Sequence, residues 1–195
     1  MPLGGCGEIG MNLNLFGHDG RWLMVDCGVK FEETPQGNEV QMPDPHFISE
    51  RAESLVGIVA THAHMDHIGA LPYLADQFGC PIYTTPFTAA VLAPKLREAR
   101  SKAVVNIVHP GQSLALGPFQ LTWLPITHST PETNGLFIET ATGNIVHTAD
   151  WKIDPTPVVG QGFDRPLWQS LASKGVDAVV CDSTNAMNLE HLSLI

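Results

Sequence analysis

Residues 61–67 of the chain read Thr-His-Ala-His-Met-Asp-His and directly follow the apolar run Leu55–Ala60. This run is typical of a short strand that is buried on both faces. Three histidines and one aspartate then fall within the six residues 62–67, and imidazole and carboxylate groups are common ligands of zinc. A cluster of this kind favours a metal site over a solvated surface loop, although single histidines in loops are common.

The spacing of these side chains divides them into two pairs. His62 and His64 are separated by one residue, so both can face the same ion from an extended loop. Asp66 and His67 arrive where a helix is expected to begin, and they can turn toward a second ion beside the first. Two ions about 3.5–4 Å apart can activate water and stabilise a leaving oxygen, which predicts a hydrolase.

Further ligands are expected where later strands end. His128 follows one predicted strand and is a candidate third imidazole for the first ion, and Asp150 follows another and could bridge both ions. Asp26 also ends an apolar strand. It either orients a ligand histidine by accepting a hydrogen bond or simply forms a turn with Gly28.

The rest of the chain reads as short strands separated by a few helices. Strands are predicted over residues 11–16, 21–26, 55–60, 81–84, 104–108, 113–116, 119–126, 135–140, 144–148 and 176–181, the last of them buried. Helices are predicted over residues 66–78 (interrupted early by Pro72), 85–102 (kinked or split at Pro94) and 166–173, and a loop over residues 28–45. Strand clusters interleaved with helices predict an α/β protein with two packed sheets and helices outside them.

The composition is that of a globular domain of 195 residues, 44% of them hydrophobic. The formal net charge of −10 argues against binding nucleic acid through a basic surface, although bound dications can dominate the field at a site. No apolar run approaches the ~20 residues that span a bilayer, and the N-terminus lacks a signal-peptide pattern. We therefore expect a cytoplasmic protein with no membrane partner.

The run at residues 61–67 resembles the H-x-H-x-D-H signature of the metallo-β-lactamase fold superfamily. Four longer segments together resemble ribonuclease J, of the β-CASP branch: residues 3–12 (LGGCGEIGMN), 127–132 (THSTPE), 147–154 (HTADWKID) and 182–185 (DSTN). The resemblance runs from Leu3 to about Asn185. It implies an αββα sandwich and an enzyme that degrades and processes RNA.

Carried over residue by residue, the resemblance implies two zinc ions, one at His62, His64 and His128 and one at Asp66 and His67, with Asp150 bridging them. Asp66, His67 and Asp150 would be the catalytic residues. Asp26 and Asp182 match acidic motifs of the family whose side chains support the metal ligands without binding the metal themselves. The implied reaction is hydrolysis of RNA phosphodiesters that leaves a 5′-phosphate, with 5′→3′ exonucleolytic and endonucleolytic modes both found in the family.

Several departures from the family pattern qualify these expectations. Family members are much longer, so residues 1–185 are expected to form a lactamase-like domain without its last strands and helix, and residues 186–195 an atypical tail. The β-CASP domain and a histidine that completes the second zinc site would be absent, and a homodimer is expected only of a full-length form. Thr130 and Ala149 stand where an apolar β-branched residue and a glycine are expected.

Two other functions fit parts of this pattern. A small-substrate hydrolase resembling the thioesterase glyoxalase II would share H-x-H-x-D-H and need no β-CASP domain, but residues 182–185 speak against it. A metal-binding fragment without catalytic activity is the non-enzymatic alternative. Manganese could replace zinc, because imidazole and carboxylate ligands suit several metals.

Overall fold

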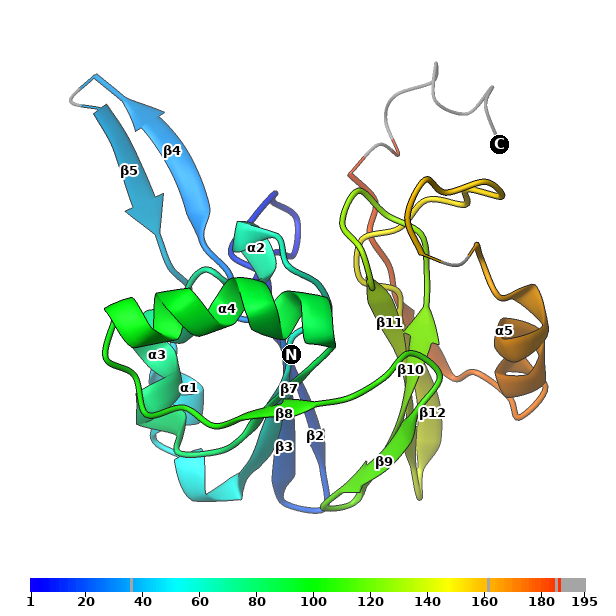
Figure 1. The fold of residues 1–195 in the computed structure, drawn as a ribbon. Coiled ribbons are helices and arrows are strands. Elements are labelled where there is room, and N and C mark those ends of the chain that lie inside the picture. Colours follow the sequence, from blue (N-terminus) through cyan, green and yellow to red (C-terminus); the bar gives the residue numbers. More distant parts are fainter. Residues whose placement is uncertain (36, 161, 185, 187–195) are drawn as a thin grey trace.

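Two β-sheets face each other in the computed structural model, which describes residues 1–35, 37–160, 162–184 and 186 (Figure 1). The first sheet has the order β1 (Pro2–Gly4), β2 (Leu13–His18), β3 (Arg21–Val25), β6 (Leu55–Val59), β7 (Ile82–Thr84) and β8 (Val105–Ile107). The second has the order β13 (Ala178–Val180), β12 (Gly143–His147), β11 (Asn134–Thr140), β10 (Phe119–Pro125) and β9 (Ser113–Leu116). The second sheet is antiparallel except for the parallel pair β12 and β13.

Helices cover the outer faces of both sheets (Figure 1). On the first sheet lie α1 (His46–Ser49), α3 (Leu71–Phe78) and α4 (Pro86–Glu98), with a short 3₁₀ turn at Ala52–Ser54, and on the second lies α5 (Arg165–Ala172). The remaining helix, α2 (Met65–Ile68), is a single turn that follows β6. The layers therefore run helix, sheet, sheet, helix, which confirms the predicted αββα sandwich.

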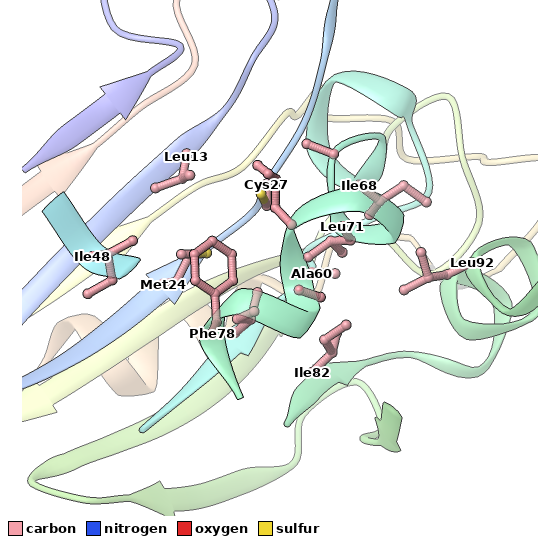
Figure 2. Close-up of a cluster of buried hydrophobic side chains, with 14 of the residues drawn as sticks. Leu13, Met24, Cys27, Ile48, Ala60, Ile68, Leu71, Phe78, Ile82 and Leu92 are labelled. Carbon is pink, nitrogen blue, oxygen red and sulfur yellow. The ribbon is translucent and has the colours of Figure 1, made fainter. Parts of the chain in front are cut away.

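Among the described residues, three apolar clusters hold these layers together. The one between the first sheet and its helices includes Met24 and Phe78, both fully or almost fully buried (Figure 2). The second cluster, between the two sheets, includes Val25 and Trp123. Met24 and Val25 are neighbours in β3 and point to opposite faces, so this strand is buried on both sides, as alternating side chains require. Leu171 of α5 lies in the third cluster, on the outer face of the second sheet.

The predicted loop at residues 28–45 is wrong. It contains an antiparallel hairpin of β4 (Lys30–Thr34) and β5 (Gly37–Gln41), which projects from the body of the molecule (Figure 1). Its apolar side chains Phe31 and Val40 lie opposite each other and are 60% and 52% exposed. The hairpin is held by its own backbone ladder rather than by a buried face, so the alternation that marks a half-buried strand is missing.

Two further predictions need correction. The segment 176–181 forms a strand, β13, but Val179 is 60% exposed, because β13 lies at the edge of its sheet and pairs only with β12 among the described residues. Helix α4 ends at Glu98 rather than near residue 102, and it continues through Pro94 without splitting. Within the described part of the chain no helix is long and apolar enough to cross a membrane. Of the predicted tail, 186–195, only Ala186 is described.

Candidate metal centre

The histidine-rich segment 61–67 leaves the carboxyl end of β6, a central strand of the first sheet, and enters α2. The backbone of residues 27–29 packs against this turn: Cys27 N–H donates to His67 O at 2.8 Å and Val29 N–H to Met65 O at 3.0 Å. A Cβ on Gly28 would lie 1.6 Å from Asp66 O, so no other residue fits there without moving the helix. The close approach of two backbones thus fixes the positions of Asp66 and His67.

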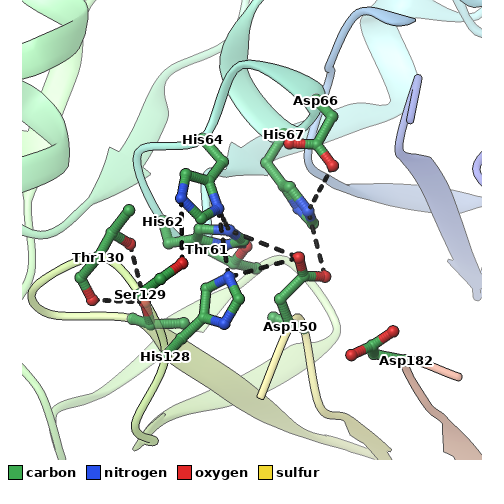
Figure 3. A network of polar contacts seen from close by, with 12 residues as sticks. Thr61, His62, His64, Asp66, His67, His128, Ser129, Thr130, Asp150 and Asp182 are labelled. Atoms are coloured by element: carbon green, nitrogen blue, oxygen red, sulfur yellow. Dashed lines mark hydrogen bonds and ion pairs between the residues drawn. The ribbon is translucent and has the colours of Figure 1, made fainter. Parts of the chain in front are cut away.

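The second sheet brings His128 and Asp150 to the same place. His128 lies just beyond β10 and Asp150 just beyond β12. Their loops are joined by an isolated bridge between Thr127 and Lys152, with Lys152 N–H donating to Thr127 O at 2.9 Å. Figure 3 shows the two side chains pointing toward the three histidines of segment 61–67.

A first candidate position is formed by three imidazole nitrogens and one carboxylate oxygen, contributed by His62, His64, His128 and Asp150. His64 Nδ1 lies 3.0 Å from His62 Nε2 and 3.2 Å from His128 Nε2. Asp150 Oδ2 lies 3.5 Å from His128 Nε2 and 3.9 Å from His62 Nε2. Ligands about 2.0–2.1 Å from a tetrahedral zinc lie about 3.3 Å from one another, so this donor set fits a zinc-sized ion.

A second candidate position lies beside the first and has three possible ligands. His67 Nε2 is 3.5 Å from Asp66 Oδ2 and 3.3 Å from Asp150 Oδ1. The two oxygens of Asp150 therefore face different positions, which suits a bridging carboxylate. The side-chain nitrogen of Asn12 donates to Asp66 O at 3.1 Å and lies 3.1 Å from His67 Nε2, so an amide also borders this position.

Asp26 lies beneath both positions and is fully buried. Its Oδ1 accepts the Thr61 N–H at 2.8 Å, and its Oδ2 lies 2.9 Å from Thr61 Oγ1 and 2.7 Å from His67 Nδ1. Asp26 has a φ of 63°, a left-handed conformation that aspartate tolerates better than most residues. The carboxylate thus contacts His67, one of the candidate ligand histidines, which is the contact expected of an aspartate that orients a ligand.

The protonation of the histidines differs between the two positions. Burial lowers the pKa of His62 well below its ordinary value, and neighbouring histidines lower it further. Burial also lowers the pKa of His128. For His67 burial acts in the same direction, but Asp26 and Asp150 outweigh it and raise the pKa to about 10. Burial would raise the pKa of Asp150, yet its hydrogen bond with His67 and that ring's charge hold it below the ordinary value.

A cavity of about 470 Å³ opens beside the second position. It is lined by the glycine-rich residues 5–10, by Asp66, His67 and Asp150, and by residues 180–184. Asp182 lies on its wall, where Oδ1 accepts the Thr184 N–H at 2.8 Å. Among the described residues Asp182 makes no contact with a candidate ligand side chain, and its negative charge offsets only a small part of the burial effect that lowers the pKa of His128.

All six predicted ligands thus converge on one place, while some neighbours were missed by sequence reasoning. The sequence pattern assigns no role to Thr61, which contacts Asp26 and His62, or to Ser129, whose Oγ lies 3.4 Å from His64 Nε2. Asn12 is 54 residues from Asp66 in the sequence, and no local pattern connects them. Polar residues adjacent to predicted ligands were the available signal for Thr61 and Ser129.

Comparison with known proteins supports this architecture. Residues 21–185 match the family described as the β-lactamase superfamily domain. Ribonuclease J of Sinorhizobium meliloti is 44% identical over 96% of this chain and 34% of that protein. Ribonuclease J of Mycobacterium tuberculosis is 40% identical over 94% of this chain and 33% of that protein. The chain therefore spans about a third of the length of these relatives.

A solved structure shares the fold at low sequence identity. A metallo-β-lactamase of Cronobacter sakazakii superposes with a TM-score of 0.62 at 13% identity, covering 99% of this chain and 79% of that one. The resemblance noted from the residues is thus confirmed by sequence and by fold. The chain belongs to the β-lactamase superfamily and, within it, is similar to ribonuclease J.

Proposed function

We propose that this chain carries the metal centre of a zinc-dependent RNA phosphodiester hydrolase similar to ribonuclease J. The observation that carries the proposal is the 44% identity to a ribonuclease J over 96% of the chain. The convergence of six histidine and aspartate side chains at two adjacent positions supports it independently. The similarity to ribonuclease J suggests RNA as the substrate, and the histidine and aspartate side chains could hold the metal ions that promote hydrolysis.

Zinc at the first position would be held by His62, His64 and His128, and zinc at the second by Asp66 and His67, with Asp150 shared. Bound there, the ions would act as Lewis acids on the phosphodiester and lower the pKa of water, which is how two-metal sites promote hydrolysis. Manganese suits the carboxylates of the second position as well as zinc does.

The residues of the chain have distinct roles in this proposal. Asp150 faces both positions through its two oxygens and holds them in one geometry. Asp66 and His67 border the cavity, so they face the side from which substrate enters. Asp182 adds negative charge to the cavity wall. Because the wall is acidic and RNA is anionic, substrate binding depends on cations at the two positions.

Cleavage of RNA tests the proposal directly. The purified chain is incubated with 5′-monophosphorylated RNA and with a thioester, each with added zinc, with added manganese and with a chelator. We expect the chain to cleave RNA but not the thioester. Cleavage should require added metal and should be lost in Asp150→Ala. His109→Ala, which removes an exposed histidine outside the cluster, serves as the matched control and retains activity.

The outcomes separate the alternatives. Products that carry a 5′-phosphate, in a ladder or as single nucleotides, distinguish endonucleolytic from 5′→3′ exonucleolytic cleavage. Turnover of the thioester without cleavage of RNA would replace the proposal with a small-substrate hydrolase. Metal binding with no turnover of either substrate would overturn the assignment of activity to this chain and leave a metal-binding module.

A further inference from the structure

Thr61 is a residue of the candidate metal centre whose hydroxyl contacts both Asp26 and His62. It precedes His62 and is fully buried, as are His62 and Asp26. Its hydroxyl oxygen lies 2.9 Å from Asp26 Oδ2 and 3.0 Å from His62 Nδ1. One hydroxyl thus lies between a buried carboxylate and Nδ1 of His62, the ring nitrogen opposite the one that faces the first metal position.

The donors and acceptors in the Asp26–Thr61–His62 contacts can be assigned by starting from the Asp26 carboxylate. A carboxylate only accepts hydrogen bonds, so the Thr61 hydroxyl donates its single proton to Asp26 Oδ2. The Thr61 oxygen can then only accept, and the proton in its contact with His62 must sit on Nδ1. With a ring proton held on Nδ1, Nε2 is the nitrogen left to bind a metal, and it lies 3.0 Å from His64 Nδ1 and 3.9 Å from Asp150 Oδ2.

The same carboxylate oxygen also accepts directly from the other position. His67 Nδ1 lies 2.7 Å from Asp26 Oδ2, so His67 donates from Nδ1 and presents Nε2 to Asp66 and Asp150. Asp26 thus reaches one ligand directly and the other through a hydroxyl.

We propose that Thr61 is a positioning residue that relays Asp26 to His62, so that a single buried carboxylate holds a proton on Nδ1 of one candidate ligand in each metal position, directly on His67 and through the Thr61 hydroxyl on His62. The relay rests on the metal centre of the proposed function, but the tautomer of His62 is a property of the metal-free chain. A partner that fixes the proton of a ligand histidine strengthens metal binding about 10–100-fold. The relay therefore acts on the first position alone, while Asp26 acts on both.

Ring-nitrogen NMR of the metal-free chain tests the relay without any metal. With ¹⁵N-labelled histidine, long-range ¹⁵N–¹H correlations are expected to show His62 protonated at Nδ1 and unprotonated at Nε2. Thr61→Val preserves size and the backbone N–H bond to Asp26 but removes the hydroxyl, and it is expected to give a mixture of tautomers. Thr61→Ser keeps the hydroxyl and is expected to restore the wild-type spectrum.

Metal affinity supplies the second readout, by competition with a chromophoric zinc chelator. We expect Thr61→Val to weaken the first position about 10–100-fold and leave the second unchanged, Thr61→Ser to bind as the wild type, and Asp26→Asn to weaken both. His62 protonated at Nε2 in the wild-type chain, or a Thr61→Val spectrum identical to wild type, would overturn the relay.

The relay and the proposed function fail in different experiments. Absence of RNA cleavage leaves the tautomer result intact, and a wrong tautomer leaves cleavage intact. If Thr61→Val does not fold, as judged by its thermal melt, the wild-type tautomer and the Thr61→Ser variant still decide the question. An Nδ1–H ring in both of these supports the relay, and an Nε2–H ring in either rejects it.

Discussion

The two candidate metal positions share Asp150 but differ in ligands and in surroundings. The first has three imidazoles and one carboxylate oxygen, which is a full tetrahedral set. The second has one imidazole and two carboxylate oxygens and borders a cavity of about 470 Å³. The first position therefore resembles a site in which protein alone can enclose the ion, whereas the second leaves coordination places that face the cavity.

Protonation separates the positions further. His62 and His128 have lowered pKa values and are neutral near pH 7, so their ligand nitrogens are free for a metal. His67 has a pKa raised to about 10 and carries an extra proton at the same pH. A metal at the second position must displace that proton, because a ligand nitrogen has to be deprotonated. Metal binding at the first position therefore needs no loss of a proton from His62 or His128, whereas binding at the second position releases one from His67.

Asp150→Ala is the change with the largest expected effect, because it removes a ligand from both positions. Removing a residue that only hydrogen-bonds to a metal ligand already weakens metal affinity about 10–100-fold. Removing the shared ligand itself should therefore weaken the affinity of each position more than about 100-fold. Metal content per chain, measured by elemental analysis after dialysis against a chelator, is expected to fall from two ions toward none.

Single-position variants provide the controls for this experiment. His64→Ala should empty the first position and His67→Ala the second, each leaving the other ion. Equal loss of both ions from His64→Ala would contradict two separable positions, and two retained ions in Asp150→Ala would contradict the shared carboxylate.

Gly28→Ala should weaken metal binding at the second position more than at the first. Its Cβ would lie 1.6 Å from Asp66 O, so α2 must shift and carry Asp66 and His67 with it. Overpacking of this kind costs typically about 1–3 kcal/mol in the free energy of unfolding. Denaturant unfolding and metal titration measure the two effects. Gly162→Ala, whose Cβ would meet its nearest atom at an ordinary 3.6 Å, is the control, and a metal loss confined to the first position would refute the prediction.

The pH dependence of metal affinity should differ between the two positions. Below pH 10 one proton leaves His67 when the second position fills, so affinity there should rise about tenfold per pH unit between pH 7 and 9. The first position should change far less over this range. Chelator competition at several pH values measures both slopes, with proton release checked by calorimetry in buffers of different ionisation enthalpy. Equal slopes would show that His67 is not the group displaced.

The metal-free fold should respond to pH in the opposite sense. The pKa of His67 is raised in the folded chain above its ordinary 6.5, so the protonated ring stabilises the fold fully below about pH 6.5. This contribution is lost as the pH rises through about 10. Thermal melting of the metal-free chain between pH 6 and 10 should show the decline, and His67→Gln should remove it.

The convergence of the candidate ligands could be predicted from the sequence because their residue types and strand-end positions are local features. His62, His64, Asp66 and His67 occupy one short run, and the apolar strand before them is unmistakable. The sequence predicts a histidine partner for Asp26 but not which one, since Thr61 and His67 lie 35 and 41 residues away and meet it only in the folded chain.

The errors in the fold have the same origin. The β4–β5 hairpin is held by its own backbone ladder, and its side chains give no buried periodicity. The segment at residues 176–181 has the apolar pattern of a buried strand, but its place at a sheet edge leaves Val179 exposed. Local pattern predicts the type of element well, whereas exposure depends on which neighbours the topology supplies.

Ala149 offers the smallest test, at the residue before the shared ligand. The resemblance led us to expect glycine there, and the structure gives the reason: Ala149 has a φ of 53°, where a side chain is strained. Ala149→Gly relieves this strain and should raise the free energy of unfolding by about 0.5–1 kcal/mol after the entropy of the unfolded glycine is counted. Ala90→Gly, at an exposed position within α4, should lower it by about 0.5–1 kcal/mol. Both positions should keep their metals in each variant, because neither change removes a ligand. Destabilisation by Ala149→Gly would show that the left-handed turn before Asp150 is not strained, and the metal centre would then impose no conformational cost on the chain at this point.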